Sequence, residues 1–152
     1  MNEASQAEQA SSMPGERATF LCVDLVDSTA LIQTLGDGRA GVVLARFADA
    51  AREVFLDHRG REIDHTDGFL VLCDDAVAAL ATALDLHRRI ASLARDTRSK
   101  LHARIGIHSG EAIVRPNTPE AIARGAKPLE VEGLAKAVCA ACAALQRAGK
   151  PC

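Results

Sequence analysis

Two aspartates stand out because each lies where a carboxylate needs a partner. Asp24 interrupts the apolar run 22–26, and Asp67 lies in the Thr66-Asp67-Gly68 link between two β-like segments. An unpaired charge is costly to bury. Two carboxylates that converge are hard oxygen ligands, suited to Mg²⁺ or Mn²⁺ together with substrate phosphates. The simpler alternatives are a helix cap or a buried ion pair for Asp24, and ordinary Asp-Gly turn chemistry for Asp67.

Hydrophobic spacing predicts the elements that must position these carboxylates. Apolar runs and alternation indicate strands, and apolar residues at helical spacing indicate helices. The predicted strands cover residues 19–25, 61–65, 69–73, 101–108 and 111–115, with a turn at Ser109-Gly110 between the last two. Four helices are predicted. The first starts from a cap within 27–29, the second covers 39–58 and the last covers 133–147. The third follows a cap at Asp74 or Asp75 and carries Val77, Leu80 and Leu84 on its apolar side. Residues 116–128 are predicted to form a polar connection.

This order of elements is a βαββαβ arrangement around a central hairpin, which is the ferredoxin-like pattern. It predicts an α+β fold with a mainly antiparallel sheet and helices packed on one face. In that topology the first strand lies beside the hairpin. We therefore expect Asp24, near a strand end, and Asp67, in the adjoining turn, to converge.

Length and composition restrict the possible functions. The 152 residues suit one domain, with 1–16 as a flexible lead-in and 17–152 as the folded part. The formal charge of -2, 3% aromatic residues and no Trp or Tyr argue against a broad nucleic-acid-binding face and against base-stacking platforms. No apolar run reaches the ~18 residues that span a bilayer. The five scattered cysteines favour reduced, buried thiols, as is usual in the cytoplasm. Taken together, these features lead us to expect a cytoplasmic protein without a membrane segment or a nucleic-acid partner.

Three motifs, in order, resemble those of the class III adenylate/guanylate cyclases. They are FLCVDLVDST over residues 20–29, GREIDHTDGF over 60–69 and RIGIHSG over 104–110. The segment 130–133, which precedes an Ala-rich helix, falls where that family has a strand turn and its last catalytic helix. The resemblance covers about residues 17–147, and three motifs in order are more specific than any one of them.

The resemblance implies a domain that converts ATP or GTP to the cyclic 3′,5′-monophosphate and pyrophosphate in cyclic-nucleotide signalling. It implies a homodimer, or a heterodimer with another cyclase domain, with active sites at the subunit interface. Two Mg²⁺ or Mn²⁺ ions would bridge Asp24, Asp67, the carbonyl of Leu25 and the triphosphate, one activating the ribose 3′-hydroxyl and the other holding the phosphates. Backbone amides at a helix start suit phosphate oxygens, and here they belong to Val26, Asp27, Ser28 and Thr29.

The sequence also departs from the family's pattern. A Lys that usually precedes the second Asp is missing, and His65 is the nearest donor there, with a plain strand-end histidine as the alternative. The second base-reading position corresponds to Glu130, so the base is not specified. The family's Asn and Arg on the last helix fall on Ala137 and Ala141, with Lys136 adjacent as a candidate substitute. By this resemblance the given sequence ends before the family's closing strands and its phosphate-binding Lys, so we expect either a truncated unit or a weak or lost activity.

Three hypotheses follow from these features. In the first, the chain is an active cyclase domain. In the second, it is a catalytically impaired cyclase-homology module that dimerises and binds nucleotide in order to regulate a partner. In the third, it is a ferredoxin-like small-ligand domain unrelated to cyclases.

Overall fold

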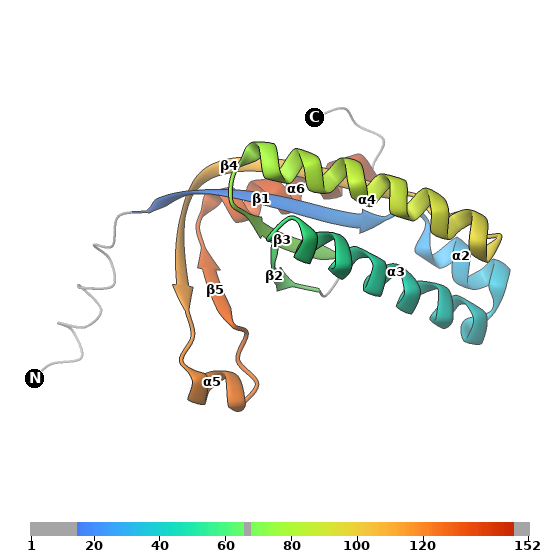
Figure 1. The fold of residues 1–152 in the computed structure, drawn as a ribbon, viewed down its shortest axis with the longest axis horizontal. Helices are drawn as coiled ribbons and strands as arrows, with labels where there is room; N and C mark the ends of the chain where they lie inside the picture. Colours follow the sequence, from blue (N-terminus) through green and yellow to red (C-terminus); the bar gives the residue numbers. More distant parts are fainter. Residues whose placement is uncertain (1–14, 66–67, 148–152) are drawn as a thin grey trace, which may run out of the picture.

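The computed structural model describes residues 15–65 and 68–147, apart from the side chains of residues 140 and 142–147. Strands and helices are interspersed along this part of the chain (Figure 1). In order they are β1 (Glu16–Leu25), α2 (Ser28–Leu35), α3 (Asp37–Asp57), β2 (Arg61–Asp64), β3 (Phe69–Cys73), α4 (Ala76–Thr97), β4 (Ala103–Pro116), α5 (Pro119–Ala123), β5 (Leu129–Glu132) and α6 (Leu134–Arg147).

The five strands form one sheet in the order β2-β3-β1-β4-β5, and every neighbouring pair is antiparallel. β1 therefore lies between β3 and β4. The segments β1–α2–α3–β2 and β3–α4–β4 are each a crossover between parallel strands with one strand between them, as in a split βαβ unit. The predicted α+β, ferredoxin-like fold with a mainly antiparallel sheet is confirmed.

The sheet has an apolar core on each face. Leu21 and Val23 of β1 pack with α2, α3 and α4 in the larger core, whereas Phe20 and Cys22 pack with α6 in the smaller one. This alternation follows from the period of two along a strand. The prediction that helices cover one face holds for α2, α3 and α4. It is wrong for α6, which lies on the opposite face through Ala135 and Cys139.

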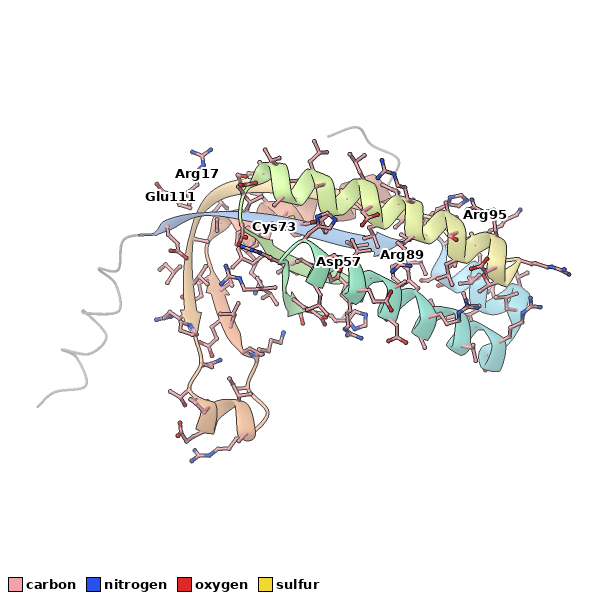
Figure 2. All side chains as sticks on the ribbon, viewed as in Figure 1. Arg17, Asp57, Cys73, Arg89, Arg95 and Glu111 are labelled. Atoms are coloured by element: carbon pink, nitrogen blue, oxygen red, sulfur yellow. The ribbon has the colours of Figure 1, made fainter. Side chains whose placement is uncertain are left out.

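Ion pairs join the two long helices on the larger core. Arg89 Nη2 donates to Glu53 Oε2 at 2.6 Å, and His58 Nε2 lies 3.3 Å from Asp85 Oδ2. Figure 2 shows Arg89 on the side of α4 that faces α3. Both pairs are partly exposed, so each contributes little to stability, about 0–1 kcal/mol. The apolar layer beneath them holds the helices on the sheet.

The structure corrects two of the predicted strands. Residues 103–116 form one continuous strand, β4, and there is no turn at Ser109-Gly110, because both residues pair with β1 opposite Thr19 and Ala18. The segment 116–128 is the predicted polar connection. It contains the short helix α5, and the chain returns as β5 against residues 113–116 of β4. Thr118 caps α5 by accepting a hydrogen bond from the Ala121 amide.

The apolar side of α4 is also corrected. Val77, Leu80 and Leu84 are exposed, at 77%, 53% and 50%. The buried side of α4 instead carries small residues among larger ones: Ala79, Thr82, Ala83, Leu86, Ile90 and Leu93. The predicted Asp75 cap is confirmed, since its carboxylate accepts from the Ala78 amide at 2.7 Å.

Three cysteines, Cys22, Cys73 and Cys139, are buried free thiols, as predicted. Cys142 and Cys152 lie outside the side chains that the structure describes. A hydrogen bond with Cys139 lowers the pKa of the Cys22 thiol against the opposing effect of burial. Across residues 15–65 and 68–147, no helix has the length and apolar character needed to cross a membrane.

Candidate functional site

Asp24 lies next to the last residue of β1, and its side chain is buried, with 8% exposed. Strand alternation directs this side chain to the face that α6 covers, together with those of Phe20 and Cys22. Its register partner on β4 is Arg104, a half-buried residue. Opposite charges at directly opposed positions are favourable. Arg104 therefore supplies positive charge beside Asp24, a role that alternation along residues 101–108 did not suggest.

Gly68, which follows Asp67, lies against the end of β1. A Cβ atom on this residue would overlap the carbonyl oxygen of Val23 and would lie 3.5 Å from the Cα atom of Asp24. The φ angle of Gly68 is +140°, which residues with side chains rarely adopt. The β2–β3 hairpin therefore meets β1 at Asp24. Thr66 and Asp67 themselves lie outside the described residues.

The turn from β1 into α2 is tied to β4. The Val26 amide donates to the carbonyl of His102 at 2.8 Å, which extends the β1–β4 ladder one step past Leu25. Asp27 occupies the N-cap position with φ 51°, but its side chain makes no capping hydrogen bond. Asp27 is therefore the N-cap residue, as predicted, but its carboxylate does not accept the capping hydrogen bond that the prediction implies. Ser28 and Thr29 belong to the first turn of α2.

His65 is held on the outside of the hairpin. Its ring stacks on Phe69 at 4.1 Å between centroids, and Arg52 Nη2 lies 3.3 Å from its Nδ1 atom. Because a guanidinium has no acceptor, Arg52 is the donor in this contact. Arg52 also forms a bidentate pair with Glu62, at 2.8 and 3.1 Å, and this hydrogen bond raises the pKa of Arg52.

Glu130 lies far from Asp24 within one chain. It pairs in register with Arg115, and Arg115 is eleven residues beyond Arg104 along β4. At ~3.3 Å per residue that is a strand path of about 36 Å. Figure 1 shows β5 and the β1–α2 turn at opposite ends of the sheet. Glu130 and Asp24 of one chain therefore do not meet at one small ligand.

Three residues named in the sequence interpretation, Lys136, Ala137 and Ala141, belong to α6. Ala137 and Ala141 are one turn apart on the exposed side of α6. Lys136 is half-buried, and its amino group is 3.4 Å from the carbonyl oxygen of Val131 on β5. This contact directs Lys136 away from the helix surface that carries the two alanines. The structure gives no support to Lys136 as a substitute for the missing Asn or Arg.

The described residues contain no cluster of three or more His, Cys, Asp or Glu side chains able to hold a metal ion. Asp67, half of the predicted carboxylate pair, lies outside the described residues. The donors that are described, a buried carboxylate at a strand end and a neighbouring backbone carbonyl, are the hard oxygen atoms that Mg²⁺ and Mn²⁺ prefer. Gly68, the residue that follows Asp67, lies against the backbone of Asp24. These features fit a divalent cation at this corner of the sheet.

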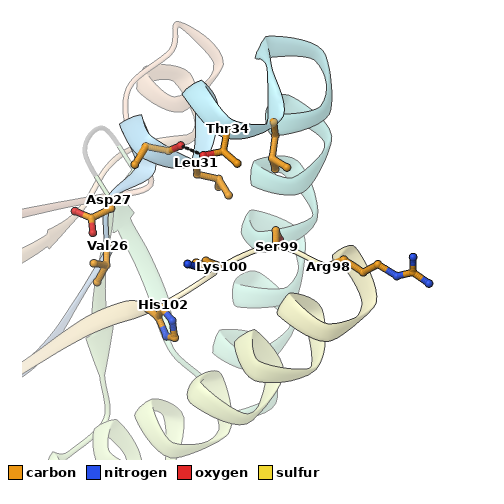
Figure 3. Close-up of a pocket in the computed structure, with 10 residues that line it drawn as sticks. Val26, Asp27, Leu31, Thr34, Arg98, Ser99, Lys100 and His102 are labelled. Carbon is orange, nitrogen blue, oxygen red and sulfur yellow. Dashed lines mark hydrogen bonds between the residues drawn. The ribbon is translucent and has the colours of Figure 1, made fainter.

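A pocket of about 370 Å³ opens near the β1–α2 turn. It lies between α2 and the α4–β4 loop, and Figure 3 shows the side chains around it. Leu31 and Leu35, which line it, belong to the larger core or pack against it, whereas Asp24 is on the opposite face of the sheet. The pocket is therefore separate from the candidate cation site.

Comparison with solved structures shows what the fold resembles. The guanylyl cyclase Cya2 superimposes with a TM-score of 0.72 at 23% identity, over 88% of this chain and 73% of that chain. The adenylyl cyclase CyaB from P. aeruginosa gives 0.70 at 16% identity, over 91% and 76%. The guanylate cyclase domain of RhGC from Catenaria anguillulae, solved with GTP, gives 0.71 at 15%, over 88% and 75%. This chain has the fold of a nucleotide cyclase domain. No family model matches the sequence, and no curated protein matches it either.

The cyclase fold places the three motifs in one structural context. The first motif is the end of β1 with the start of α2, the second is the β2–β3 hairpin, and the third is the half of β4 that pairs with β1. The first and third motifs are register partners, and the second approaches the first through Gly68.

Proposed function

We propose that this chain is a nucleotidyl cyclase domain of the class III type that acts on ATP or GTP, in a cytoplasmic signalling protein. The observation that carries the proposal is the corner where the buried Asp24 meets the hairpin at Gly68. The fold shared with adenylyl and guanylyl cyclases supports it.

In this proposal Asp24, Asp67 and the Leu25 carbonyl hold two Mg²⁺ or Mn²⁺ ions. Such ions lower the pKa of a bound hydroxyl and neutralise phosphate charge. The amides of 26–29 bind the phosphates at the start of α2. The ribose 3′-oxygen then forms a bond to the α-phosphorus, the bond from that phosphorus to the β-phosphate breaks, and pyrophosphate leaves while the hydroxyl proton passes to solvent.

The length of the sheet supports an active site shared between two chains. Asp24 and Glu130 lie at opposite ends of β4, so a nucleotide near Asp24 of one chain is beyond the reach of Glu130 of the same chain. A site that uses both residues needs Glu130 from a second cyclase domain. We therefore propose a homodimer, or a heterodimer with another cyclase domain.

A second function is favoured by the alanines on α6. Ala137 and Ala141 are exposed, and neither side chain can position a ribose or neutralise charge on a phosphate. Loss of one preorganised donor can cost ~10²–10³ in rate. A dimerising module that binds nucleotide without rapid turnover is therefore the alternative.

One assay separates the two functions. The purified chain is incubated with Mn²⁺ and either ATP or GTP, and cyclic product and nucleotide binding are both measured, with the Asp24→Ala variant alongside. Cyclic product that disappears in the variant supports the cyclase. Metal-dependent binding without product supports the regulatory module. If neither ATP nor GTP binds in the presence of Mn²⁺, both functions are wrong.

A further inference from the structure

The pocket between α2 and the α4–β4 loop has the size and chemistry of a ligand site. Its volume of about 370 Å³ is within the ~300–1,000 Å³ typical of small-molecule sites. Its inner wall is apolar, formed by Val26, Ala30, Leu31 and Leu35. Leu31 is 7% exposed and belongs to the larger core, so this wall is anchored to the body of the domain.

The opposite wall carries positive charge. Lys100 and His102 come from the α4–β4 loop, and within residues 15–65 and 68–147 neither side chain has a hydrogen bond or an ion pair. In Figure 3 the amino group of Lys100 points toward the side of the pocket where Val26 and Asp27 lie. Arg98 also lines the pocket, but its guanidinium points away from it.

The two walls are held at a fixed separation. The Val26 amide donates to the His102 carbonyl at 2.8 Å, and the Ser99 amide donates to the Ala94 carbonyl at 3.1 Å. Thr34, on the α2 side, already donates its hydroxyl to the carbonyl of Ala30 at 2.8 Å. The polar group that these walls leave to a ligand is therefore the Lys100 amino group, with the Asp27 carboxylate at the rim, because the His102 ring projects toward α4 in Figure 3.

We infer that this pocket binds a small amphiphilic carboxylate, with its hydrocarbon part against α2 and its carboxylate at the Lys100 amino group. The apolar wall suits a chain of methylene groups, because burial against it removes their surface from water. The loop supplies the positive charge for an anion. Binding requires no divalent cation, no nucleotide and no second chain.

A ligand in this pocket would contact the start of the proposed phosphate-binding segment 26–29. Val26 and Asp27 line the pocket and also begin the segment 26–29. A ligand that holds this turn changes the affinity for nucleotide, and by linkage nucleotide changes the affinity for the ligand by the same factor. This consequence rests on the proposed function, whereas binding of the carboxylate does not.

Octanoate titrated into the isotopically labelled full chain, without metal or nucleotide, tests the inference by amide NMR. We expect saturable shifts at Ala30, Leu31, Leu35 and Ser99. Octanol has the same chain without the charge and should bind at least ten-fold more weakly. Lys100→Met should weaken octanoate at least ten-fold, and Ala30→Phe, which fills the pocket, should abolish the shifts.

Arg98→Met is the matched control, because this residue lines the pocket with its charge directed outward, and it should bind octanoate as the wild type does. Absence of octanoate shifts at these residues would overturn the inference. Equal binding of octanol, or unchanged binding by Lys100→Met, would overturn the assignment of a carboxylate. Because none of these samples contains nucleotide, failure here leaves the cyclase assay to be decided on its own.

Discussion

Gly68 lies against the carbonyl of Val23, with no room for a side chain between the β2–β3 hairpin and β1. The contact joins two residues that are forty-five positions apart in the sequence, one in each of two motifs. It sets where the hairpin ends relative to Asp24. The proposed function depends on this contact, and the predictions below begin from it.

Replacing Gly68 with Ala should destabilise the domain by at least ~2 kcal/mol, since a non-Gly residue at positive φ alone costs ~1–3 kcal/mol. The overlap with Val23 adds to that cost. Gly41→Ala is the matched control, because this glycine is inside α3 with open space around it. It should stabilise by about 0.5–1 kcal/mol. Urea unfolding measures both, and equal effects of the two changes would contradict the contact.

Replacing Asp24 with Asn should lower cyclic-nucleotide formation by ~10² or more, as loss of other charge-stabilising groups does. The change keeps the shape of the side chain and removes an anionic oxygen ligand. If the wild type binds nucleotide without turnover, the same variant should lose Mn²⁺-dependent binding. Asp74→Asn is the control, because Asp74 follows β3 at the opposite end of the sheet. Retained metal dependence in Asp24→Asn would mean that the cation binds elsewhere.

Restoring polar groups on α6 should raise activity. In the double variant Ala137→Asn with Ala141→Arg, both side chains project from the exposed side of the helix, so the fold should tolerate them. We expect a rise in turnover of ~10²-fold or more if these two groups are what the site lacks. The exchanged double variant, Ala137→Arg with Ala141→Asn, carries the same composition in the wrong order. A similar rise in both variants, measured as product per minute, would argue against a positional role.

The stability of the domain should fall in alkaline solution because of Cys73. Burial, and then the carboxylates of Asp74 and Asp75, raise the pKa of the Cys73 thiol from 9.0 to about 11. Above pH 9 the unfolded chain releases this proton while the folded chain keeps it, so the folded state binds more protons. The contribution of Cys73 is therefore complete below pH 9 and is lost between pH 9 and about 11. Urea unfolding of wild type and Cys73→Ala across this range should give a shallower decline for the variant, and parallel declines would contradict the shift.

The order of elements was predictable from the sequence because strand and helix patterns differ in period. Two positions show where the pattern fails. Ser109-Gly110 resembles a turn, but β1 provides a pairing partner for each residue, and tertiary pairing overrides local preference. Val77, Leu80 and Leu84 have helical spacing, yet Ala79 and Ala83 face the core, because small residues let α4 approach its neighbours closely.

The candidate site was predictable at Asp24, where a carboxylate inside an apolar run signals a buried charge. The sequence left Arg104 as either a functional polar residue or an outward-facing strand residue, with the second interpretation favoured. Its register with Asp24 could not be predicted, because register is a property of the folded sheet. The distance from Glu130 to Asp24 could not be predicted either. It depends on β4 continuing unbroken to Pro116 before β5 turns back.

Paramagnetic broadening by Mn²⁺ in the presence of a non-hydrolysable nucleoside triphosphate tests most directly whether Asp24 and Asp67 share one cation site. In amide NMR of the full chain, we predict that signals of residues 23–26 and 67–69 broaden together at low Mn²⁺, and that Asp24→Asn or Asp67→Asn removes both effects. Broadening at one segment alone, or broadening that either variant leaves intact, would contradict the shared site.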